Sequence, residues 1–206
     1  MRSIKSKIKT MSEANEIAKR LRNNHTIVST NGVFDVLHIG HLESFLQAKQ
    51  FSNPNHLNAV LYGAGKNSYQ EINRTNNFLI VGLNSDDSVR RYKVGRPINT
   101  EFERAYLVAS LECVDLVTIF PQDDPREFLK GIKPDYHFKS ENGYKGIEKG
   151  VVESNGGQVV LIPEIPDHST TITMNKMVKS FLEAEKSQPR AGDGTYQQER
   201  YYRKGV

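Results

Sequence analysis

Apolar side chains along the chain recur with two different periods, and this pattern predicts helices and strands in succession. Residues 12–22 repeat apolar positions at helical spacing, with Ser12 as a candidate N-cap. Residues 25–30 form a β-branched run typical of a buried strand. Residues 39–51 return to the helical period, and residues 78–83 read FLIVGL, a second strand. Strand, glycine turn, helix and strand in this order predict a βαβ unit with parallel strands.

The same alternation continues through the rest of the chain. Further helices are predicted at residues 100–113, 125–132, 144–154 and 169–185, and further strands at residues 115–120, 135–138 and 158–162. The predicted fold class is α/β, a Rossmann-like five-stranded parallel sheet with helices on both faces. Ligands of such sheets bind beyond the carboxyl ends of the strands, and Thr30–His41 follows one of these ends.

Two segments do not follow the alternating pattern. Residues 52–77 are polar, rich in asparagine and long for a helix-to-strand connection, so we interpret them as an insertion. Residues 187–206 have little apolar content and are predicted to form a flexible C-terminal tail. The sequence therefore predicts one domain over residues 1–186, with this insertion and this tail.

Composition and charge narrow the class of protein. Of the 206 residues, 37% are hydrophobic and 25% are charged, a balance typical of a soluble globular protein. No apolar run approaches the roughly 20 residues that cross a bilayer, so we expect a cytoplasmic protein without a membrane partner. The single cysteine, Cys113, excludes an internal disulfide and a cysteine-based zinc cage. The net charge of +4 suits a polyphosphate ligand, and because the basic residues are dispersed we expect no nucleic-acid partner.

The strongest chemical signal is the segment TNGVFDVLHIGH at residues 30–41. It places His38 and His41 three residues apart at the start of a helix, so both imidazoles share one face. The helix N-terminus adds free N–H groups and a partial positive charge, which together bind anions. Gly40 removes a side chain where a nucleotide would lie against the backbone, and Gly32 lets the turn approach phosphates. The segment suits a nucleoside triphosphate whose leaving pyrophosphate gains negative charge.

Other interpretations of these residues are a pair of ordinary surface histidines or a metal site. The six specified positions of G-x-F-D-x-x-H-x-G-H, at a strand-to-helix turn, argue against chance, and no cysteine or third histidine lies nearby in sequence. Asp35 is the candidate metal residue, as a ligand that organises Mg2+. Its alternative role, which we favour slightly, is to hold the turn through backbone hydrogen bonds.

The segment Gly32–His41 resembles the signature of the cytidylyltransferase-like nucleotidyltransferases, whose fold is a Rossmann-like α/β domain. Within that superfamily the chain is similar to the adenylyltransferase domain of heptose 1-phosphate adenylyltransferases, which make ADP-heptose for bacterial surface polysaccharides. The similarity runs from about Ile8 to about Val178. Its landmarks are TNGVFDVLHIGHLESF, VGLNSDDSV, GRPINTEFERAYLVASLECVDLV, KPDYHFK, ESNGGQVVLIP and HSTT.

The resemblance implies a set of site residues. His38, His41 and Lys93 are implied to be catalytic, with the histidines contacting the triphosphate. We predict that Thr30, Asn31, Gly32, Phe34, Gly40, Ser169, Thr170 and Thr171 bind the nucleotide, the last three because they match the family's Ser-Thr-Thr segment. The residues predicted to bind the acceptor or its phosphate are Arg96, Lys139 and Glu141, of which the resemblance implies Arg96.

Several of these residues have a structural alternative. Ser169 and Thr170 suit N-capping as well as an anion site, and the two roles are compatible. The basic residues from Arg90 to Arg96 could form a solvated charged stretch. Arg104, within a predicted helix, could pair with Glu101 or Glu103.

The chain departs from the family pattern beside the acceptor. The family's Lys-Gly-Gly-Asp-Tyr is replaced by KSENGY at Lys139–Tyr144, which removes the glycine pair and the aspartate. The basic stretch before Arg96 is also about one residue short. These departures leave the acceptor sugar open, whereas the histidine segment is intact.

The function that follows is direct transfer of a nucleoside monophosphate from NTP to a sugar phosphate such as heptose 1-phosphate, with release of pyrophosphate. An acceptor phosphate is ionised near pH 7, so catalysis needs positioning and charge stabilisation rather than a strong base. ATP is preferred to CTP as donor, with Mg2+ as cofactor, and the resemblance implies a homodimer.

Three alternatives stay open. One is a CTP-dependent cytidylyltransferase acting on glycerol 3-phosphate or an aminoalcohol phosphate. The second is a fragment of a class I aminoacyl-tRNA synthetase, against which the short chain and the lack of a clear KMSKS loop argue. The third is a non-catalytic nucleotide-binding protein.

Overall fold

The structure, a computed structural model, describes residues 3–51, 76–163, 165–166 and 168–187. The chain divides into two compact units, Met1–Thr170 and Thr171–Val206. The predicted insertion at residues 52–77 and the predicted tail at residues 187–206 lie almost wholly outside the described residues. In the part of the chain that is described, no helix has the length and apolar character required to cross a membrane.

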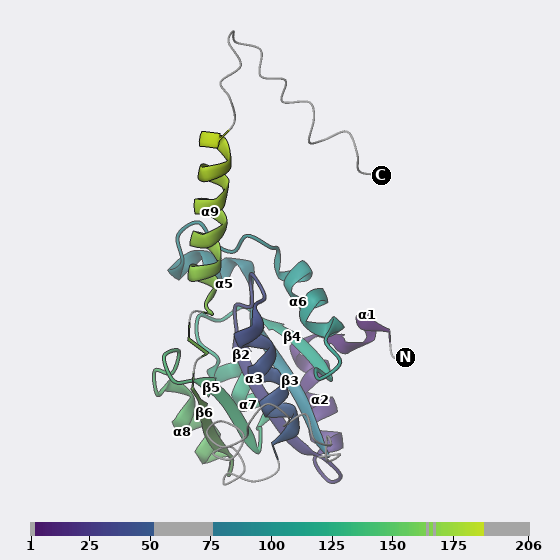
Figure 1. The fold of residues 1–206 in the computed structure, drawn as a ribbon. Coiled ribbons are helices and arrows are strands. Elements are labelled where there is room, and N and C mark those ends of the chain that lie inside the picture. The colour runs from purple at the N-terminus through teal and green to yellow at the C-terminus, as the bar shows by residue number, and fades with distance from the viewer. Residues whose placement is uncertain (1–2, 52–75, 164, 167, 188–206) are drawn as a thin grey trace. The chain divides into compact units, whose positions relative to one another are not determined.

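A parallel sheet forms the centre of the first unit (Figure 1). In the described residues it has six strands in the order β1-β4-β3-β2-β5-β6. The strands are β1 (Ile8–Lys9), β2 (Thr26–Gly32), β3 (Asn77–Asn84), β4 (Leu116–Phe120), β5 (Tyr136–Ser140) and β6 (Gln158–Ile162). The helices of this unit are α1 (Ile4–Lys7), α2 (Met11–Leu21), α3 (Ile39–Gln50), α5 (Asp86–Tyr92), α6 (Glu101–Ser110), α7 (Arg126–Ile132) and α8 (Ile147–Ser154).

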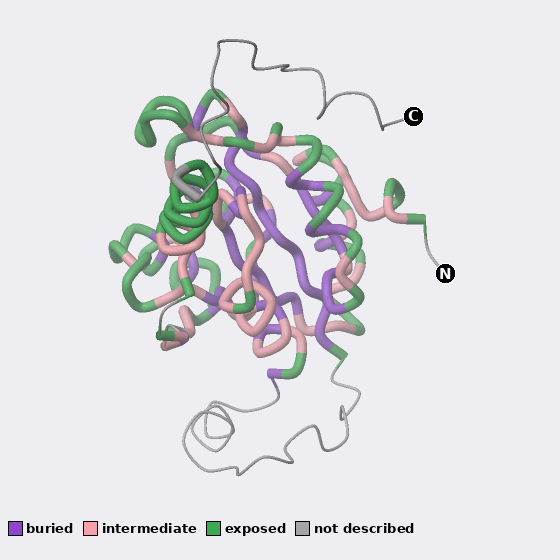
Figure 2. The backbone as a smooth tube through the Cα atoms, turned by 45° about the horizontal axis from the view of Figure 1, so that its top comes forward, coloured by how far each residue is buried: buried purple, intermediate pink, exposed green. Residues whose placement is uncertain are grey.

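Successive strand residues point to opposite faces of the sheet, and each face is covered by helices. Val28 and Val81 pack in one apolar cluster with Phe45 of α3 and with residues of α6. Their neighbours Ile27 and Ile80 pack in a second cluster with residues of α2, α7 and α8. The central strands are buried along their length (Figure 2). The predicted Rossmann-like α/β class is therefore confirmed.

The strand count is one higher than predicted. The additional strand, β1, has two residues and pairs with β4 through Ile8 and Val117. A strand of two residues is too short to show the period-2 alternation that identifies strands in a sequence.

Two local predictions also need correction. Helix α2 is capped by Thr10, not Ser12, because the Thr10 hydroxyl accepts from Glu13 N while the Glu13 carboxylate accepts from Thr10 N. Helix α5 was not predicted, since its sequence DDSVRRY carries no apolar stripe. Its start is fixed instead by Ser85, whose hydroxyl accepts from Ser88 N.

The second unit contains helix α9 (Thr170–Ser187) from Thr171 onward. Its position agrees with the helix predicted at residues 169–185. Met177, Val178, Phe181 and Leu182 of this helix are exposed.

Strand order places a crevice in the first unit. The chain leaves β2 toward β3 and β4, then returns to the other side of β2 to form β5 and β6. Loops after β2 and β5 therefore leave in opposite directions. In such sheets the ligand site lies at this switch point, outside the carboxyl ends of the strands.

Candidate active site

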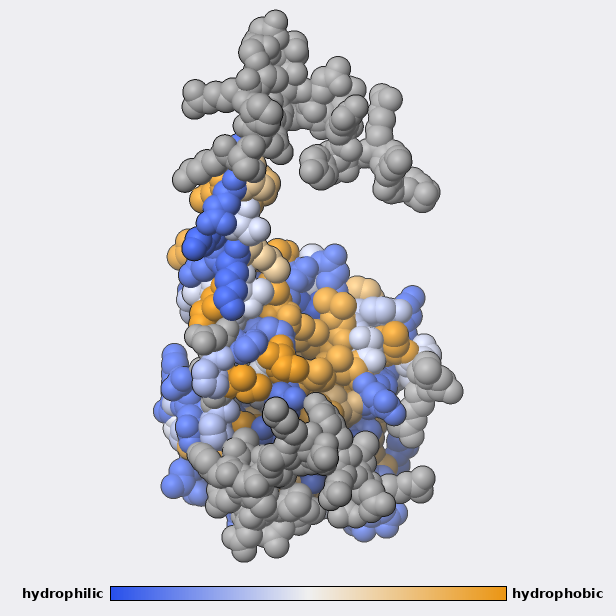
Figure 3. Space-filling view, in the orientation of Figure 1, coloured by the Kyte–Doolittle hydropathy of each residue, from blue (hydrophilic) through white to orange (hydrophobic). Residues whose placement is uncertain are grey.

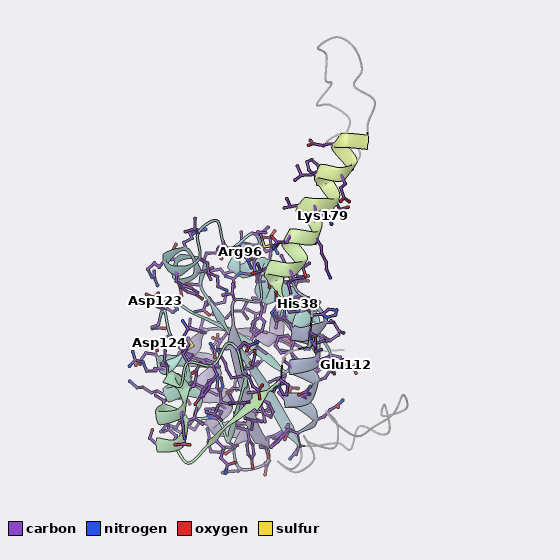
Figure 4. All side chains as sticks on the ribbon, turned by 60° about the vertical axis from the view of Figure 1, so that its left-hand side comes forward. His38, Arg96, Glu112, Asp123, Asp124 and Lys179 are labelled. Carbon is purple, nitrogen blue, oxygen red and sulfur yellow. The ribbon has the colours of Figure 1, made fainter. Side chains whose placement is uncertain are left out.

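A pocket of about 220 Å³ lies at the carboxyl ends of β2 and β5, at the switch point of the sheet. Of the predicted site residues, it is lined by Thr30, Asn31, Gly32, Phe34, Asp35, His41, Lys93, Arg96, Lys139 and Thr170. The predicted residues outside this lining are His38, Gly40, Glu141, Ser169 and Thr171. Figure 4 shows His38 and Arg96 at the same end of the sheet, although they lie far apart in the sequence.

The two histidines stack at the start of α3. His38 occupies the N-cap position with extended backbone, and His41 follows in the first turn. Their ring centroids are 3.7 Å apart with an interplanar angle of 29°. Burial, then the nearby charges of His38 and Lys93, lower the pKa of His41 to about 3. His41 is therefore neutral near pH 7 in the ligand-free protein, and the His38 ring stacks against it.

The two glycines of the motif make room for rings of the protein. A Cβ on Gly32 would lie 2.9 Å from the Phe34 ring, and one on Gly40 would lie 3.1 Å from the His38 ring. Phe34 has a left-handed φ of 49° and packs edge-on against His41, with ring centroids 5.1 Å apart. The prediction that these glycines serve contact with a nucleotide is thus incomplete, because each also accommodates a side chain that shapes the site.

Asp35 binds the loop that carries Arg96. Its carboxylate accepts hydrogen bonds from Arg96 Nε and from the backbone N–H groups of Ile98 and Asn99, the latter at 2.9 Å. The Asn99 amide returns a hydrogen bond to the Asp35 carbonyl at 2.6 Å. The Asp35 side chain is fully buried. These hydrogen bonds, although burial opposes them, lower its pKa.

The predicted role of Asp35 as a metal ligand does not fit this geometry. Both of its oxygens are engaged by the loop, which is the alternative role noted from the sequence. Among the described residues, no group of three or more His, Cys, Asp or Glu side chains could hold a metal ion. The donors available in this part of the chain do not suit a magnesium cage.

Two cations enter the pocket from the segment after α5. Lys93 follows the last turn of α5, and Arg96 pairs with Asp35 while remaining 12% exposed. Partial burial first, and the charge of Arg96 second, lower the pKa of Lys93. Like charges drawn together in this way favour an anionic ligand that lies between them.

Arg104 has a role that the sequence did not predict. This residue is fully buried and pairs with Asp86 of α5 at 2.8 Å, so the predicted pairing with Glu101 or Glu103 is wrong. It also donates to the carbonyls of Val33, Asn84 and Asn99. Glu103 instead forms a capping box with Thr100, and Glu101 accepts from Asp86 N. Arg104 thereby joins the ends of β2 and β3 to the loop bearing Arg96.

The acceptor side of the pocket differs from the prediction. The Lys139 ammonium donates to the main-chain and side-chain oxygens of Asn31 at 3.3 and 3.0 Å, and pairs with Glu148 at 3.4 Å. Glu141 is exposed, and the pocket lining here is Ser140 and Gly143 instead. Two more buried polar residues behind Asn31, Ser29 and His137, were missed. The sequence signal available for them was a histidine between the two aromatic residues of the strand, Tyr136 and Phe138.

Ser169, Thr170 and Thr171, which were predicted to bind the nucleotide, lie at the start of α9. Thr170 lines the pocket of the first unit. Thr171 begins the second unit.

The assembled groups can bind and polarise a polyphosphate. A neutral imidazole, an ammonium and a guanidinium converge on one pocket, next to the N-terminus of α3, where the N-cap side chain makes no capping hydrogen bond to the backbone. Donors and charges aimed at one point stabilise negative charge that develops there.

Comparison with known proteins gives similarity over most of the chain. A family described as "Cytidylyltransferase-like" matches residues 64–186, a range that includes Lys93, Arg96 and Lys139 and begins after His41. The bifunctional protein HldE of a Nitratiruptor species is 40% identical over 173 residues, which cover 82% of this chain and 32% of that protein.

A second HldE, from Trichlorobacter lovleyi, is 36% identical over 186 residues, covering 87% of this chain and 33% of that protein. The chain thus spans about a third of the length of the curated relatives that it matches. The crystal structure of the lipopolysaccharide core biosynthesis protein from Thermoplasma volcanium aligns with 68% of this chain and 95% of that chain, at 21% identity and a TM-score of 0.47.

Proposed function

Because the chain belongs to the cytidylyltransferase-like family and is a nucleotidyltransferase, we propose that it transfers AMP from ATP to a sugar phosphate such as heptose 1-phosphate, releasing pyrophosphate. The observation that carries this proposal is the convergence of His41, Lys93 and Arg96 on the pocket at the switch point of the sheet. Similarity to two HldE proteins, together with the resemblance to heptose 1-phosphate adenylyltransferases, supports the choice of donor and acceptor.

The proposed reaction is a single in-line displacement. An ionised oxygen of the acceptor phosphate attacks the α-phosphorus of ATP and forms a new P–O bond. The bond from the α-phosphorus to the oxygen that bridges it to the β-phosphorus breaks, and its electron pair leaves with pyrophosphate. No proton has to be removed from the nucleophile, so the chain needs no strong general base.

The residues of the pocket act on the charge of this reaction. His41, neutral in the free protein, donates a hydrogen bond to the triphosphate, whose negative charge raises the pKa of the imidazole on binding. Lys93 and Arg96 stabilise the charge that accumulates on the departing pyrophosphate. Mg2+ arrives with ATP, held by the phosphates and water, as is usual for this ion.

Family membership sets aside the synthetase fragment and the non-catalytic binding protein. The remaining alternative is CTP with glycerol 3-phosphate or an aminoalcohol phosphate, because KSENGY at Lys139–Tyr144 departs from the family pattern on the acceptor side.

The test is product identification with the purified chain. ATP and CTP are each incubated with a heptose 1-phosphate, a hexose 1-phosphate, glycerol 3-phosphate and phosphocholine, and pyrophosphate and nucleotide products are measured by mass spectrometry. We expect ADP-sugar from ATP and a sugar 1-phosphate, and a much lower rate of its formation from His41→Ala. CTP-dependent turnover of glycerol 3-phosphate alone would replace the proposed substrates and leave nucleotidyl transfer intact.

A second assay addresses the acceptor loop. Glu141 stands where the family keeps glycine, and an acidic group near an anionic acceptor is repulsive. We expect Glu141→Gly to change the ratio of kcat/KM between heptose and hexose 1-phosphates. Glu112→Gly, the same replacement at an exposed turn that does not line the pocket, is the matched control. An unchanged ratio in Glu141→Gly would remove this residue from the acceptor site.

We further propose a homodimer. Helix α6 exposes Phe102, Tyr106 and Leu107, with exposed fractions of 58%, 37% and 46%. Figure 3 shows apolar surface on the face where α6 lies in Figure 1. Clustered apolar side chains on a helix of a soluble protein are typical of an interface.

A further inference from the structure

A row of buried polar side chains lies directly behind the pocket. Ser29 of β2 and His137 of β5 are fully buried and opposite each other in register. The Ser29 hydroxyl lies 2.8 Å from His137 Nδ1, and His137 Nε2 lies 3.2 Å from Asn31 Oδ1. Asn31 lines the pocket, so this row of hydrogen-bonded side chains runs from the interior of the sheet to the ligand site.

The donors and acceptors of the neighbouring groups determine which atom carries each proton in this row of polar groups. The Lys139 ammonium has donors only, so the Asn31 side-chain atom 3.0 Å from it is the oxygen. His137 Nε2 faces the same oxygen and must carry its proton. Burial first, and the Lys139 charge second, lower the pKa of His137 to about 3, so the ring is neutral and its Nδ1 accepts from the Ser29 hydroxyl.

The Asn31 carboxamide is consequently held in one orientation. Its oxygen accepts from both His137 and Lys139, and a carbonyl oxygen has two lone pairs. Lys139 is itself fixed by Glu148, which is 3% exposed. Among the described residues, the Asn31 Nδ2 group donates to no partner. It is therefore the one group of this side chain available to a ligand.

We propose that Ser29 and His137 are positioning residues, which orient Asn31 so that its Nδ2–H group binds a phosphoryl oxygen of the substrate. The ligand class follows from the rest of the pocket, where His41, Lys93 and Arg96 already favour an anion. Lys139 contributes by holding Asn31 rather than by meeting the phosphate itself. The inference rests on the proposed function for its substrate, and the phosphoryl group belongs either to ATP or to the acceptor.

The test compares two replacements of one residue. His137→Leu fills the site without donor or acceptor, whereas His137→Gln keeps an N–H for Asn31 and an oxygen for Ser29. Thr118→Val, at a buried polar residue of β4 that does not line the pocket, is the matched control. KM and kcat are measured separately for ATP and for the sugar 1-phosphate, alongside thermal unfolding.

We expect His137→Leu to raise KM for one of the two substrates about 10-fold, within the range for a hydrogen bond to a charged group. His137→Gln restores KM to within about threefold of the unmodified chain, and Thr118→Val leaves it unchanged. Asn31→Asp, which replaces the donor by an anion, raises the same KM by about 10- to 100-fold. The substrate whose KM moves identifies the source of the phosphoryl group.

Unchanged KM values in His137→Leu would overturn the inference. So would equal losses in His137→Leu and His137→Gln that follow a lowered melting temperature, because this pattern indicates a structural role alone.

Two measurements do not depend on turnover. The nitrogen chemical shifts of His137 in the ligand-free protein should report the Nε2–H tautomer, and the Nδ1–H tautomer would overturn the inference. Calorimetric binding of ATP and of inorganic phosphate should weaken for at least one of them in Asn31→Asp. If the chain fails to release pyrophosphate with every substrate pair, the proposed function fails, while these two measurements still decide the inference.

Discussion

At the scale of single residues, the two stacked imidazoles of His38 and His41 have different positions relative to the pocket. His41 lines the pocket, whereas His38 lies outside its lining, with the centroids of the two stacked rings 3.7 Å apart. We expect His41→Ala to lower kcat by roughly 10²–10³, the effect of removing one preorganised donor to the transition state. His38→Ala should act in the same direction by releasing the His41 ring. Steady-state rates of pyrophosphate release measure both, and a kcat within a factor of about three would remove that residue from the catalytic set.

Lys93 and Arg96 both line the pocket, but only Arg96 forms an ion pair with the buried Asp35. Lys93 is only partly buried, so Lys93→Ala should raise KM for a phosphorylated substrate without changing the free energy of unfolding. Arg96→Ala also removes the ion-pair partner of the buried Asp35 carboxylate. This loss should lower the free energy of unfolding by about 3–5 kcal/mol.

Urea unfolding and KM for each substrate separate the two effects. Arg90→Ala, which removes an exposed ion pair on helix α5, is the control. A normal KM in Lys93→Ala would contradict its place in the phosphate site.

At the scale of elements, the accuracy of the sequence predictions followed the length of the apolar pattern. Strand β3 contains a long continuous apolar run, and helix α3 repeats apolar positions at helical spacing, so both were predicted. Strand β1 has two residues, and α5 depends on the Ser85 cap rather than on an apolar face.

Site residues that lie next to one another in the sequence were predicted. Side-chain pairs whose two residues are distant in the sequence were not. The histidine motif occupies one segment, and its pattern alone indicated an anion site. Ser29 and His137 are 108 residues apart in sequence, and no local pattern shows that they pair. The partner of Arg104 was predicted wrongly for the same reason, since Asp86 comes from another helix.

At the scale of the whole molecule, the exposed apolar residues of α6 predict self-association. Phe102→Asp and Leu107→Asp should convert a dimer into a monomer, because a charge buried in an interface is costly. Light scattering coupled to size-exclusion chromatography measures the mass of each variant. Lys130→Asp, on the opposite side of the sheet, should keep the mass of the unmodified chain. A monomeric unmodified chain at micromolar concentration would contradict the proposal.

The stability of the whole chain should depend on pH through the buried His137. The pKa of His137 is lowered from 6.5 to about 3 in the folded chain. Between these values the unfolded chain binds the proton and the folded chain does not, so stability falls as pH decreases from 6.5 toward 3. One such group contributes a slope of about 1.4 kcal/mol per pH unit. Denaturant unfolding from about pH 7 to about pH 4.5 should show a shallower slope in His137→Leu, and an equal slope would contradict this assignment.

The engagement of Asp35 by the loop at Arg96 has a consequence for metal exchange. Because the Asp35 carboxylate already accepts hydrogen bonds from Arg96 and from the backbone of the loop, we expect the phosphates of the nucleotide to select the divalent ion, rather than a cage among the described residues. Mn2+ and Co2+ should therefore replace Mg2+ in turnover, with relative rates set by their complexes with ATP. A chelator should abolish turnover while leaving the melting temperature of the nucleotide-free chain unchanged, and a fall in that temperature would show that the protein holds an ion of its own.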